Sequence, residues 1–368
     1  MNPERIPVND LRTSANEKSA LAAAVNRTLE RGWYVNGPEL EAFEHEFAAH
    51  CGADYCIGVA NGTDALTLAL AALNLAPGSL VATVANAGGY ASTAIARNGL
   101  TPCYIDVDES GLMSAIHLEV TLNQLPPAAI ILTHLYGNSD GAARVAKLGR
   151  DRAIPLIEDC AQAHGAMTSQ GRVGSLGEAG CFSFYPTKNL GGIGDGGAVT
   201  TSNHAIAEQI KSLRNYGWRK QRYVSEGRGY NSRLDEIQAA VLRLRLETLD
   251  TRNDRRREIA ACYLAAMSNP SLAMGRTVEP HDVFHLFVVK TSDREQTRTA
   301  FDEIGITTDV HYPVPDYQQP RFSPYASESV TLEATDAHCR NVLTIPCYPS
   351  MEQQQVDRVC EALRIGWL

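Results

Sequence analysis

Lys188 is the only charged side chain within residues 182–189, where its neighbours are apolar, aromatic or uncharged polar residues. An aromatic, strand-like run ends at Pro186 just before it, and five glycines then lead into a second strand at residues 198–201. Glycine is favoured where the backbone takes a positive φ or passes close to another group. Because an enclosed lysine loses part of its charge and becomes an amine nucleophile, Lys188 is the first catalytic candidate. The alternative is a surface lysine on a glycine hairpin.

Asp159 and Gln162 form a second candidate pair, since a strand-like run ends at Asp159 and Gln162 follows three residues later. A helical turn that begins at Cys160 would place both side chains on one side. A carboxylate at a strand end and a lysine on a glycine loop suit pyridoxal phosphate. The lysine bonds to its aldehyde, and the aspartate keeps the pyridine nitrogen protonated. Taken separately, the aspartate can be a helix cap and the lysine a surface residue.

Gly62 and Thr63 lie between a short apolar strand at residues 55–60 and a helix with an apolar stripe. Free backbone N–H groups at such a helix start bind anions, and phosphate is a common one. An ordinary helix cap by Asn61 or Thr63 is the other interpretation. The presence of Asp159 and Lys188 in the same chain favours a phosphate-bearing cofactor.

The glycine run at residues 192–197 also matches the dinucleotide pattern Gly-x-Gly-x-x-Gly. That pattern binds a dinucleotide only where a helix follows it, whereas residues 198–201 continue as a strand. No Gly-x4-Gly-Lys-Ser/Thr sequence is present, so a P-loop is excluded too.

Strand-like runs recur through the first half of the chain, at residues 80–84, 101–105, 129–133, 154–158 and 180–184, with helical segments such as 91–98 and 142–151 between them. This alternation predicts an α/β fold with a mainly parallel sheet covered by helices on both faces. Ligands of such sheets bind beyond the carboxyl ends of the strands. The Gly62, Asp159 and Lys188 segments all fall there.

A long helical stretch at residues 234–267 contains a polar run at residues 250–257, which we interpret as a hinge between domains. We therefore predict a large domain at residues 1–250 and a small α+β domain at residues 251–368. The small domain is expected to contain strands near residues 283–290, 307–311 and 342–345, and helices near residues 294–304 and 351–363.

The composition excludes several classes of function. The net charge of −9 disfavours nucleic acid or an anionic membrane as the partner. No apolar run is long enough to span a bilayer, and the first residues lack a signal-peptide pattern. The nine cysteines contain no Cys-x-x-Cys pair, so we expect a reduced, cytoplasmic protein without a metal site.

Six segments together carry a family resemblance, at residues 54–70, 158–166, 182–197, 229–240, 311–315 and 345–349. They resemble the DegT/DnrJ/StrS nucleotide-sugar aminotransferases nearly from end to end. The resemblance implies an aspartate-aminotransferase-like fold (pyridoxal phosphate fold type I). It also implies pyridoxal 5'-phosphate and a homodimer whose active sites lie at the subunit interface.

By that resemblance, Lys188 is the lysine that bonds to the cofactor, and Asp159 holds the pyridine nitrogen. Gln162 lies by the ring hydroxyl. Phosphate contacts come from Gly62, Thr63 and Ser183 of one subunit and from Asn231 of the other. Tyr90 is the candidate for the aromatic residue over the cofactor ring, although its segment departs from the Thr-Phe-type pattern of the family. The resemblance also places Tyr185, His311 and Tyr312 at the sugar, with a packed structural histidine as the alternative for His311.

A basic segment at residues 214–233 supports an anionic substrate. It holds six cationic side chains, Arg214, Arg219, Lys220, Arg222, Arg228 and Arg233, and one acid, Glu226. The aromatic residues Tyr216, Trp218 and Tyr223 are interleaved with them. Guanidinium groups suit a diphosphate and the aromatic rings suit a base or sugar, so Arg219 is a candidate substrate contact. A solvated basic loop and a nucleic-acid contact are the alternatives.

These features lead to one functional expectation. The chain transfers an amino group from glutamate to a keto sugar nucleotide, and the resemblance points to C-3 of a dTDP-3-keto-6-deoxyhexose. Amination at C-4 is the close alternative. A sugar dehydratase of the same family is a weaker one, because the members considered carry histidine in place of Lys188. A sensor without catalytic activity is the third.

Overall fold

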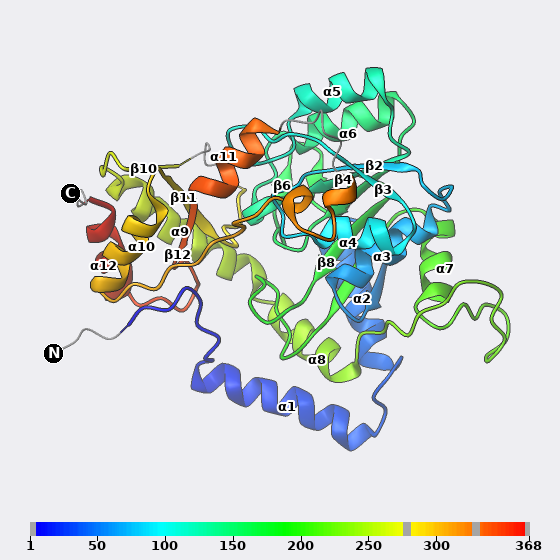
Figure 1. The fold of residues 1–368 in the computed structure, drawn as a ribbon. Coiled ribbons are helices and arrows are strands. Elements are labelled where there is room, and N and C mark those ends of the chain that lie inside the picture. The colour runs from blue at the N-terminus through cyan, green and yellow to red at the C-terminus, as the bar shows by residue number, and fades with distance from the viewer. Residues whose placement is uncertain (1–4, 275–280, 326–331, 365–368) are drawn as a thin grey trace.

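The structure is a computed structural model, and it describes residues 5–274, 281–325 and 332–364 (Figure 1). A seven-stranded sheet forms the centre of the larger part, in the order β1-β9-β8-β5-β4-β2-β3. Its strands are β1 (Tyr55–Val59), β2 (Leu80–Thr83), β3 (Thr101–Tyr104), β4 (Ala129–Thr133), β5 (Leu156–Asp159), β8 (Ala179–Ser183) and β9 (Gly197–Thr201).

Six of these seven strands run in one direction, and β9 runs antiparallel to both β1 and β8. Phe182 on β8 lies opposite Ala198 on β9, so the glycine loop turns the chain back on itself. The expected α/β fold with a mainly parallel sheet is confirmed. A short hairpin of β6 (Met167–Thr168) and β7 (Gly171–Arg172) lies outside this sheet.

Helices cover both faces of the sheet because the buried strands alternate their side chains between two cores. Ile131 of β4 packs in one core with α3 (Gly62–Ala72), α4 (Tyr90–Arg97) and α7 (His204–Leu213). Ile130 and Leu132 pack in the other with α5 (Ala115–Gln124) and α6 (Ala142–Asp151). On that second face, α2 (Pro38–Cys51) and α8 (Glu236–Leu246) cover β8, and α1 (Ala15–Arg31) packs on α8.

The smaller part has a core of its own around a three-stranded antiparallel sheet, β10 (Leu272–Ala273), β11 (Phe287–Thr291) and β12 (Val342–Ile345). Its helices are α9 (Leu249–Ala266), α10 (Arg294–Glu303), α11 (Glu333–Asn341) and α12 (Gln353–Arg364). Ile6 joins this core, since the N-terminal segment forms a bridge with Ile306 before α1 crosses to the larger part (Figure 1).

Two expectations about this region are wrong. Residues 307–311 form a single bridge between Asp309 and Thr344 rather than a strand, because His311 bonds to the side chains of Thr344 and Tyr136 instead of to a neighbouring strand. The long helical stretch expected at residues 234–267 is two helices, and the polar run at residues 250–257 is not where they separate. It lies within α9, where ion pairs three residues apart support it, and the helical stretch breaks between α8 and α9 instead.

The domain boundary at residue 250 stays a prediction.

Within the described ranges, no helix is both long and apolar enough to cross a membrane. Among the described residues, single turns of 3-10 helix are found at Leu135–Gly137, Asp316–Gln318 and Ser323–Tyr325.

Candidate active site

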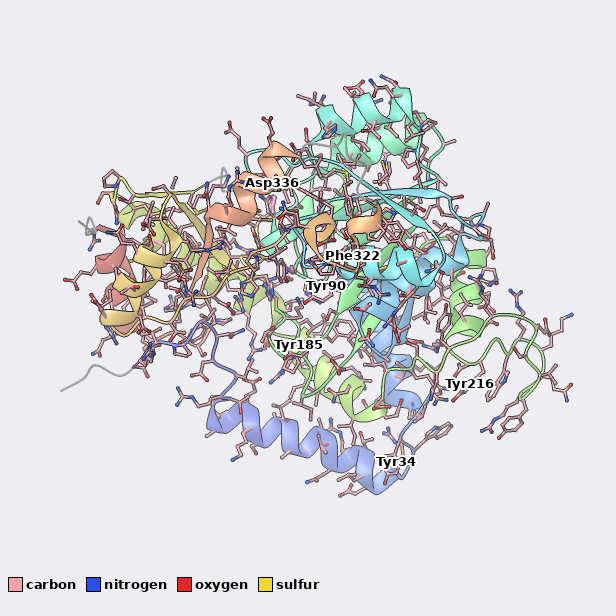
Figure 2. All side chains as sticks on the ribbon, viewed as in Figure 1. Tyr34, Tyr90, Tyr185, Tyr216, Phe322 and Asp336 are labelled. Carbon is pink, nitrogen blue, oxygen red and sulfur yellow. The ribbon has the colours of Figure 1, made fainter. Side chains whose placement is uncertain are left out.

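A cavity of about 380 Å³ opens at the edge of the sheet where β1, β5 and β8 end and β9, which lies between β1 and β8, begins. Most of the sequence candidates line it: Gly62, Thr63, Tyr90, Asp159, Ser183, Tyr185 and Lys188, together with Asn61, Leu66, Ala161 and Asp195. Figure 2 shows Tyr90 and Tyr185 near the middle of the molecule, whereas Tyr34 and Tyr216 lie toward its lower right edge. The structure therefore gathers residues far apart in the sequence into one site.

Lys188 lies on the loop that leaves β8, and its backbone N–H donates to the carbonyl of Tyr185 at 2.8 Å. This turn places the lysine against the cavity rather than in solvent. Burial lowers the pKa of Lys188 from 10.5 to about 8, and the carboxylate of Asp159 opposes that shift. The amine therefore has a substantial neutral fraction near neutral pH, as a nucleophile or a proton carrier requires.

Asp159 is the last residue of β5, and it is 6% exposed. Burial raises the pKa of its carboxyl, and the N–H of Ala161 at 3.2 Å, together with the charge of Lys188, pulls it back down. A buried carboxylate with so few donors is stabilised by a cationic N–H that enters the cavity. The position thus suits a protonated ring nitrogen.

Glu158, the residue before Asp159, points to the other side of β5 and is fully buried. Its carboxylate accepts the backbone N–H groups of Gly174 and Leu176 and lies 2.8 Å from Nε2 of His134. Cys160 stands close to this pair. Because Glu158 is already hydrogen-bonded on both oxygens, we interpret the cluster as an anchor for the β5 end.

The start of α3 forms one wall of the cavity. Asn61 caps this helix by accepting the N–H of Asp64 at 2.8 Å through its side chain and the N–H of Ala65 through its carbonyl. In the part of the chain that the structure describes, the N–H groups of Gly62 and Thr63 have no acceptor. With the hydroxyl of Ser183 beside them, they form a cradle for an anion.

Gln162 holds a fixed amide orientation beside the cavity. Its Oε1 accepts the backbone N–H of Tyr136 at 2.7 Å, and its Nε2 donates to the hydroxyl of Tyr312 at 3.2 Å. The rings of Tyr312 and Tyr90 meet edge to face, with centroids 6.2 Å apart. The amide N–H groups of Gln162 are thereby directed toward the small-domain side of the site.

His311 and Tyr312 bring the smaller part of the chain to this site. Nδ1 of His311 lies 2.9 Å from the hydroxyl of Thr344. Burial lowers the pKa of His311, Asp309 opposes that shift, and the charge of Lys188 adds to it. Burial also disfavours the charged form of Tyr312, and it therefore raises the pKa of the phenol. Both side chains stay neutral at physiological pH.

A model of the DegT/DnrJ/EryC1/StrS aminotransferase family matches residues 15–364 of the chain. The chain belongs to this family. The dTDP-3-amino-3,6-dideoxy-alpha-D-galactopyranose transaminase of Aneurinibacillus thermoaerophilus is 42% identical over 366 residues, which cover 98% of this chain and 100% of the relative. The dTDP-3-amino-3,4,6-trideoxy-alpha-D-glucose transaminase of Streptomyces venezuelae is 40% identical over 364 residues, covering 98% and 96%.

Solved structures agree with this assignment. The structure of S. venezuelae DesV superimposes with a TM-score of 0.93 at 39% identity, covering 98% of each chain. A DegT/DnrJ/EryC1/StrS aminotransferase from Brucella abortus superimposes with a TM-score of 0.90 at 28% identity, covering 95% of this chain and 96% of the other. The expected family, the aminotransferase fold and the class of enzyme are thereby confirmed.

Five expected site residues of this aminotransferase are not among those that line the cavity of their own chain: Gln162, His311 and Tyr312, described above, and Arg219 and Asn231. Arg219 is exposed and contacts Gln209 of α7. Asn231 is exposed and forms a bridge with Asn215, on the loop that Tyr216 marks in Figure 2. Neither residue is among those that line the cavity.

Arg214 corrects the picture of the basic segment. Its guanidinium is buried, donates to the carboxylate of Glu44 at 2.5 Å and donates to the carbonyl of Gly58 at 2.8 Å. Its charge is neutralised inside the larger part and is not offered to a ligand. The exposed cations of the segment are Arg219, Lys220, Arg222 and Arg228.

Two residues of the aminotransferase site were not among the candidates expected from the sequence. Tyr136 follows the carboxyl end of β4, and its backbone holds Gln162. Asp195 lies in the glycine loop and lines the cavity. The position of Tyr136 after a buried strand was the available signal, since ligands gather at strand ends.

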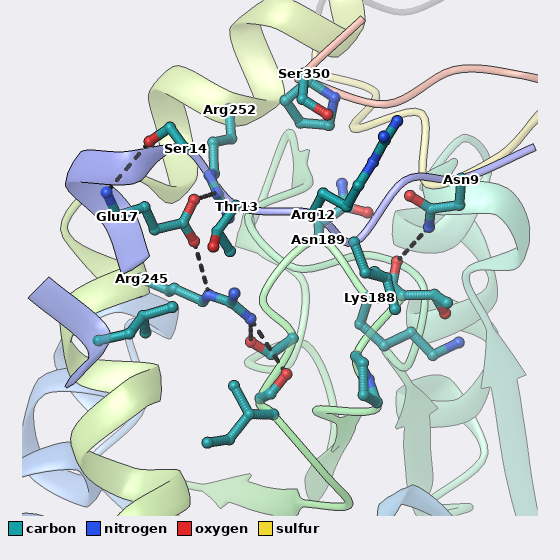
Figure 3. A pocket seen from close by; sticks show the side chains of 18 of the residues that line it. Asn9, Arg12, Thr13, Ser14, Glu17, Lys188, Asn189, Arg245, Arg252 and Ser350 are labelled. Carbon is teal, nitrogen blue, oxygen red and sulfur yellow. Dashed lines mark hydrogen bonds and ion pairs between the residues drawn. The ribbon is translucent and has the colours of Figure 1, made fainter. Parts of the chain in front are cut away.

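A second cavity, of about 500 Å³, lies on the other side of the lysine loop beneath the N-terminal segment (Figure 3). Lys188 lines this cavity too, and the charged groups around Glu17 are paired with one another. Glu17 pairs with Arg245 at 3.1 Å and with Arg252 at 2.9 Å, and Arg12 pairs with Asp10. Figure 3 shows the side chain of Lys188 directed away from the Glu17 cluster, so we assign the chemistry to the first cavity.

Proposed function

We propose that this chain binds pyridoxal 5'-phosphate in the 380 Å³ cavity and moves an amino group from glutamate to a keto sugar nucleotide, at C-3 of a dTDP-3-keto-6-deoxyhexose. One observation carries the proposal: Lys188, with its pKa lowered to about 8, shares a cavity with buried Asp159 and an open helix N-terminus. The choice of substrate is supported by the names of the relatives from Aneurinibacillus and Streptomyces, which are both transaminases of dTDP-3-amino sugars.

The residues fit this cofactor group by group. The N–H groups of Gly62 and Thr63, with the hydroxyl of Ser183, would hold its phosphate. The carboxylate of Asp159 would accept a hydrogen bond from the protonated ring nitrogen, and Nζ of Lys188 would bond to the aldehyde carbon. Bound in this way, the cofactor supplies an electron sink for the bond that breaks at the amino-bearing carbon.

The chain's own side chains then move the proton. Nζ of Lys188, once freed by an incoming amine, would take the proton from the amino-bearing carbon of glutamate and give it to the carbon that was the aldehyde carbon of the cofactor. The negative charge of Asp159 would keep the ring nitrogen of the cofactor protonated and positively charged. Tyr136 and Tyr312 fix the amide of Gln162, which would donate a hydrogen bond to the ring hydroxyl of the cofactor. The rings of Tyr90 and Tyr312, which contact each other, would limit the access of water to the site. The steps run in reverse on the sugar ketone.

The partner chain completes the site in this proposal. Asn231 and Arg219 are exposed on their own chain, and we assign them to the phosphate and to the sugar nucleotide of the partner subunit. The exposed cations of the basic segment suit a diphosphate. Tyr185, which is 52% exposed, together with His311 and Tyr312, is assigned to the sugar.

The experiment is spectral and kinetic. The purified protein with pyridoxal phosphate should show a visible absorption band that borohydride removes. Lys188→Ala should lose both the band and multiple-turnover transamination, whereas the surface control Lys211→Ala should keep them. Turnover by Lys188→Ala would overturn the assignment. A panel of 3-keto and 4-keto sugar nucleotides with glutamate separates C-3 from C-4 amination, and loss of a sugar hydroxyl without amination would identify a dehydratase.

A further inference from the structure

Asn189, the residue after Lys188, has every hydrogen-bonding atom of its side chain engaged inside the protein. It is 5% exposed. Its Nδ2 donates to Oδ1 of Asn253 and to the carbonyl of Val283, both at 2.8 Å. Its Oδ1 lies 3.1 Å from Nδ1 of His285. Because the carbonyl of Val283 can only accept, the orientation of the amide is fixed and Nδ1 of His285 must donate.

Asn253, on α9, continues this network toward Asp159. It is 1% exposed, and its Nδ2 donates to the carbonyl of His164 at 2.9 Å. The chain passes close at this point, since a β-carbon on Gly165 would lie 2.8 Å from Nδ2 of Asn253. His164 belongs to the segment that begins with Asp159 and Gln162. The two asparagine side chains therefore join the loop after β8 directly to the loop after β5.

Val283 connects the same network to the loop after β4. Its backbone N–H donates to the carbonyl of Gly137 at 3.1 Å. Gly137 has a φ of 86°, and a β-carbon there would lie 2.7 Å from Val283 and 2.9 Å from the carbonyl of Gln162. Tyr136, beside it, binds the amide of Gln162. The hydrogen bonds thus form a closed circuit through three strand ends.

We propose that Asn189 and Asn253 are a positioning pair that sets the place of the Lys188 amine relative to Asp159. This inference rests on the proposed function, in which Lys188 moves a proton and Asp159 holds the ring nitrogen. The pair lies on neither reacting group and acts through the loops that carry them. An amine displaced by about 1 Å transfers its proton about a hundredfold more slowly, so the pair matters for rate more than for binding.

Neutral substitutions test this, because an added carboxylate would change the charge near Lys188. We expect Asn253→Ala and Asn189→Ala each to lower kcat about tenfold or more, while KM for glutamate changes by less than about threefold. The rate at which the visible band forms when pyridoxal phosphate meets cofactor-free protein should fall as well. The double variant should be little worse than either single variant, since the two side chains form one unit.

Asn98→Ala is the matched control. Asn98 is also a buried asparagine, and its Nδ2 donates to the carbonyls of Thr67 and Ala94, both at 3.0 Å, between α3 and α4. The Asn98→Ala variant should have a lower melting temperature than the wild type, but the visible band should form at the wild-type rate. If Asn189→Ala does not fold, Asn253→Ser provides the milder test at a residue that is not adjacent to Lys188.

The outcomes separate this inference from the proposed function. If the unmodified protein forms no band with pyridoxal phosphate, the proposed function fails. If it forms the band and the folded Asn253→Ala or Asn253→Ser protein keeps wild-type kcat and band-formation rate, the positioning pair is overturned. Additive losses in the double variant would also overturn it, because they would mean two separate structural anchors.

Discussion

Gly62 and Ser183 approach each other so closely that a β-carbon on Gly62 would lie 2.7 Å from Cβ of Ser183. Real β-carbons do not come that near another carbon, so only glycine lets the start of α3 rest against the end of β8. This contact brings two free N–H groups and a hydroxyl to one wall of the cavity. It gives the glycine a physical reason that the sequence pattern alone did not supply.

The first prediction follows from that contact. Gly62→Ala should force α3 away from Ser183 at a cost of about 1 to 3 kcal/mol, which weakens cofactor affinity about tenfold to a hundredfold. Titration of the cofactor-free protein with pyridoxal phosphate measures this affinity. In the double variant Gly62→Ala with Ser183→Gly the 2.7 Å clash is removed and only a 3.2 Å contact with the Cα of residue 183 is left, so its affinity should lie close to that of Ser183→Gly alone. Additive losses would show that the close contact is not the cause.

The second prediction concerns the stability of the cofactor-free protein. Burial lowers the pKa of Lys188 from 10.5 to about 8, so the charged amine destabilises the folded state. Below pH 8 both states hold the proton and the cost is fully present; between pH 8 and 10.5 the folded state has lost it first, so stability rises with pH. Lys188→Met should therefore stabilise the protein by about 3 kcal/mol near pH 7.

Thermal melts of the cofactor-free proteins between pH 7 and 10.5 measure this difference. The gain from Lys188→Met should shrink as the pH approaches 10.5, whereas the surface change Lys211→Met should show no such trend. A gain that is absent at pH 7 would mean that the amine is solvated in the folded protein.

The third prediction tests the charge of Asp159. Asp159→Asn keeps the size of the side chain but removes the group that holds the ring nitrogen protonated. We expect the visible band to form and the rate of amino transfer from glutamate to fall about a hundredfold to a thousandfold, as when one electrostatic contact to a transition state is removed. The surface change Asp151→Asn should leave the rate unchanged. An equal rate in Asp159→Asn would remove Asp159 from the mechanism.

The sequence predicted the elements whose periodicity was strong, and it failed where polar contacts replace periodicity. Residues 142–151 form the helix that was expected, and the buried strands lie where apolar runs predicted them. Within the polar run of α9, the inward-facing Asn253 and Arg256 could not be told from the exposed residues, because only the folded chain supplies their partners. Residues 307–311 contain strand-forming residues, yet side-chain bonds take the place of a ladder.

The site was predictable as far as its chemistry depends on residue type. Lys188 and Asp159 carry groups that pyridoxal phosphate needs, and the strand-end rule placed both at one edge of the sheet. The circuit through Asn189 and Asn253 could not be read from the sequence, because its hydrogen bonds join residues far apart along the chain, such as Asn189 and Val283 at 94 positions. Likewise, the neutralisation of Arg214 by Glu44 depends on contact across 170 positions.

The fourth prediction concerns Asp316, a carboxyl next to α4 that is 1% exposed. Burial raises its pKa from 3.8 to about 7, although Ser92 donates to it at 2.5 Å. Between pH 4 and 7 the folded state holds a proton that the unfolded state has lost, so this group makes the protein less stable as the pH rises. Asp316→Asn, which resembles the protonated acid, should match the wild type near pH 4. At pH 8 it should be more stable by up to about 4 kcal/mol. Urea unfolding of both proteins at pH 4 and at pH 8 measures this difference in the free energy of unfolding. An equal difference at the two pH values would contradict the prediction.

The last prediction tests whether two chains share each site. One chain carries Lys188→Ala and the other carries Arg219→Ala with Asn231→Ala, so neither homodimer holds a complete site. If Arg219 and Asn231 serve the partner's cavity, a heterodimer isolated by two affinity tags contains one intact site of two. It should therefore show about half of the wild-type turnover per dimer. Should both residues serve their own chain's cavity, every site in the heterodimer keeps one defect, and turnover stays at the level of the separate variants.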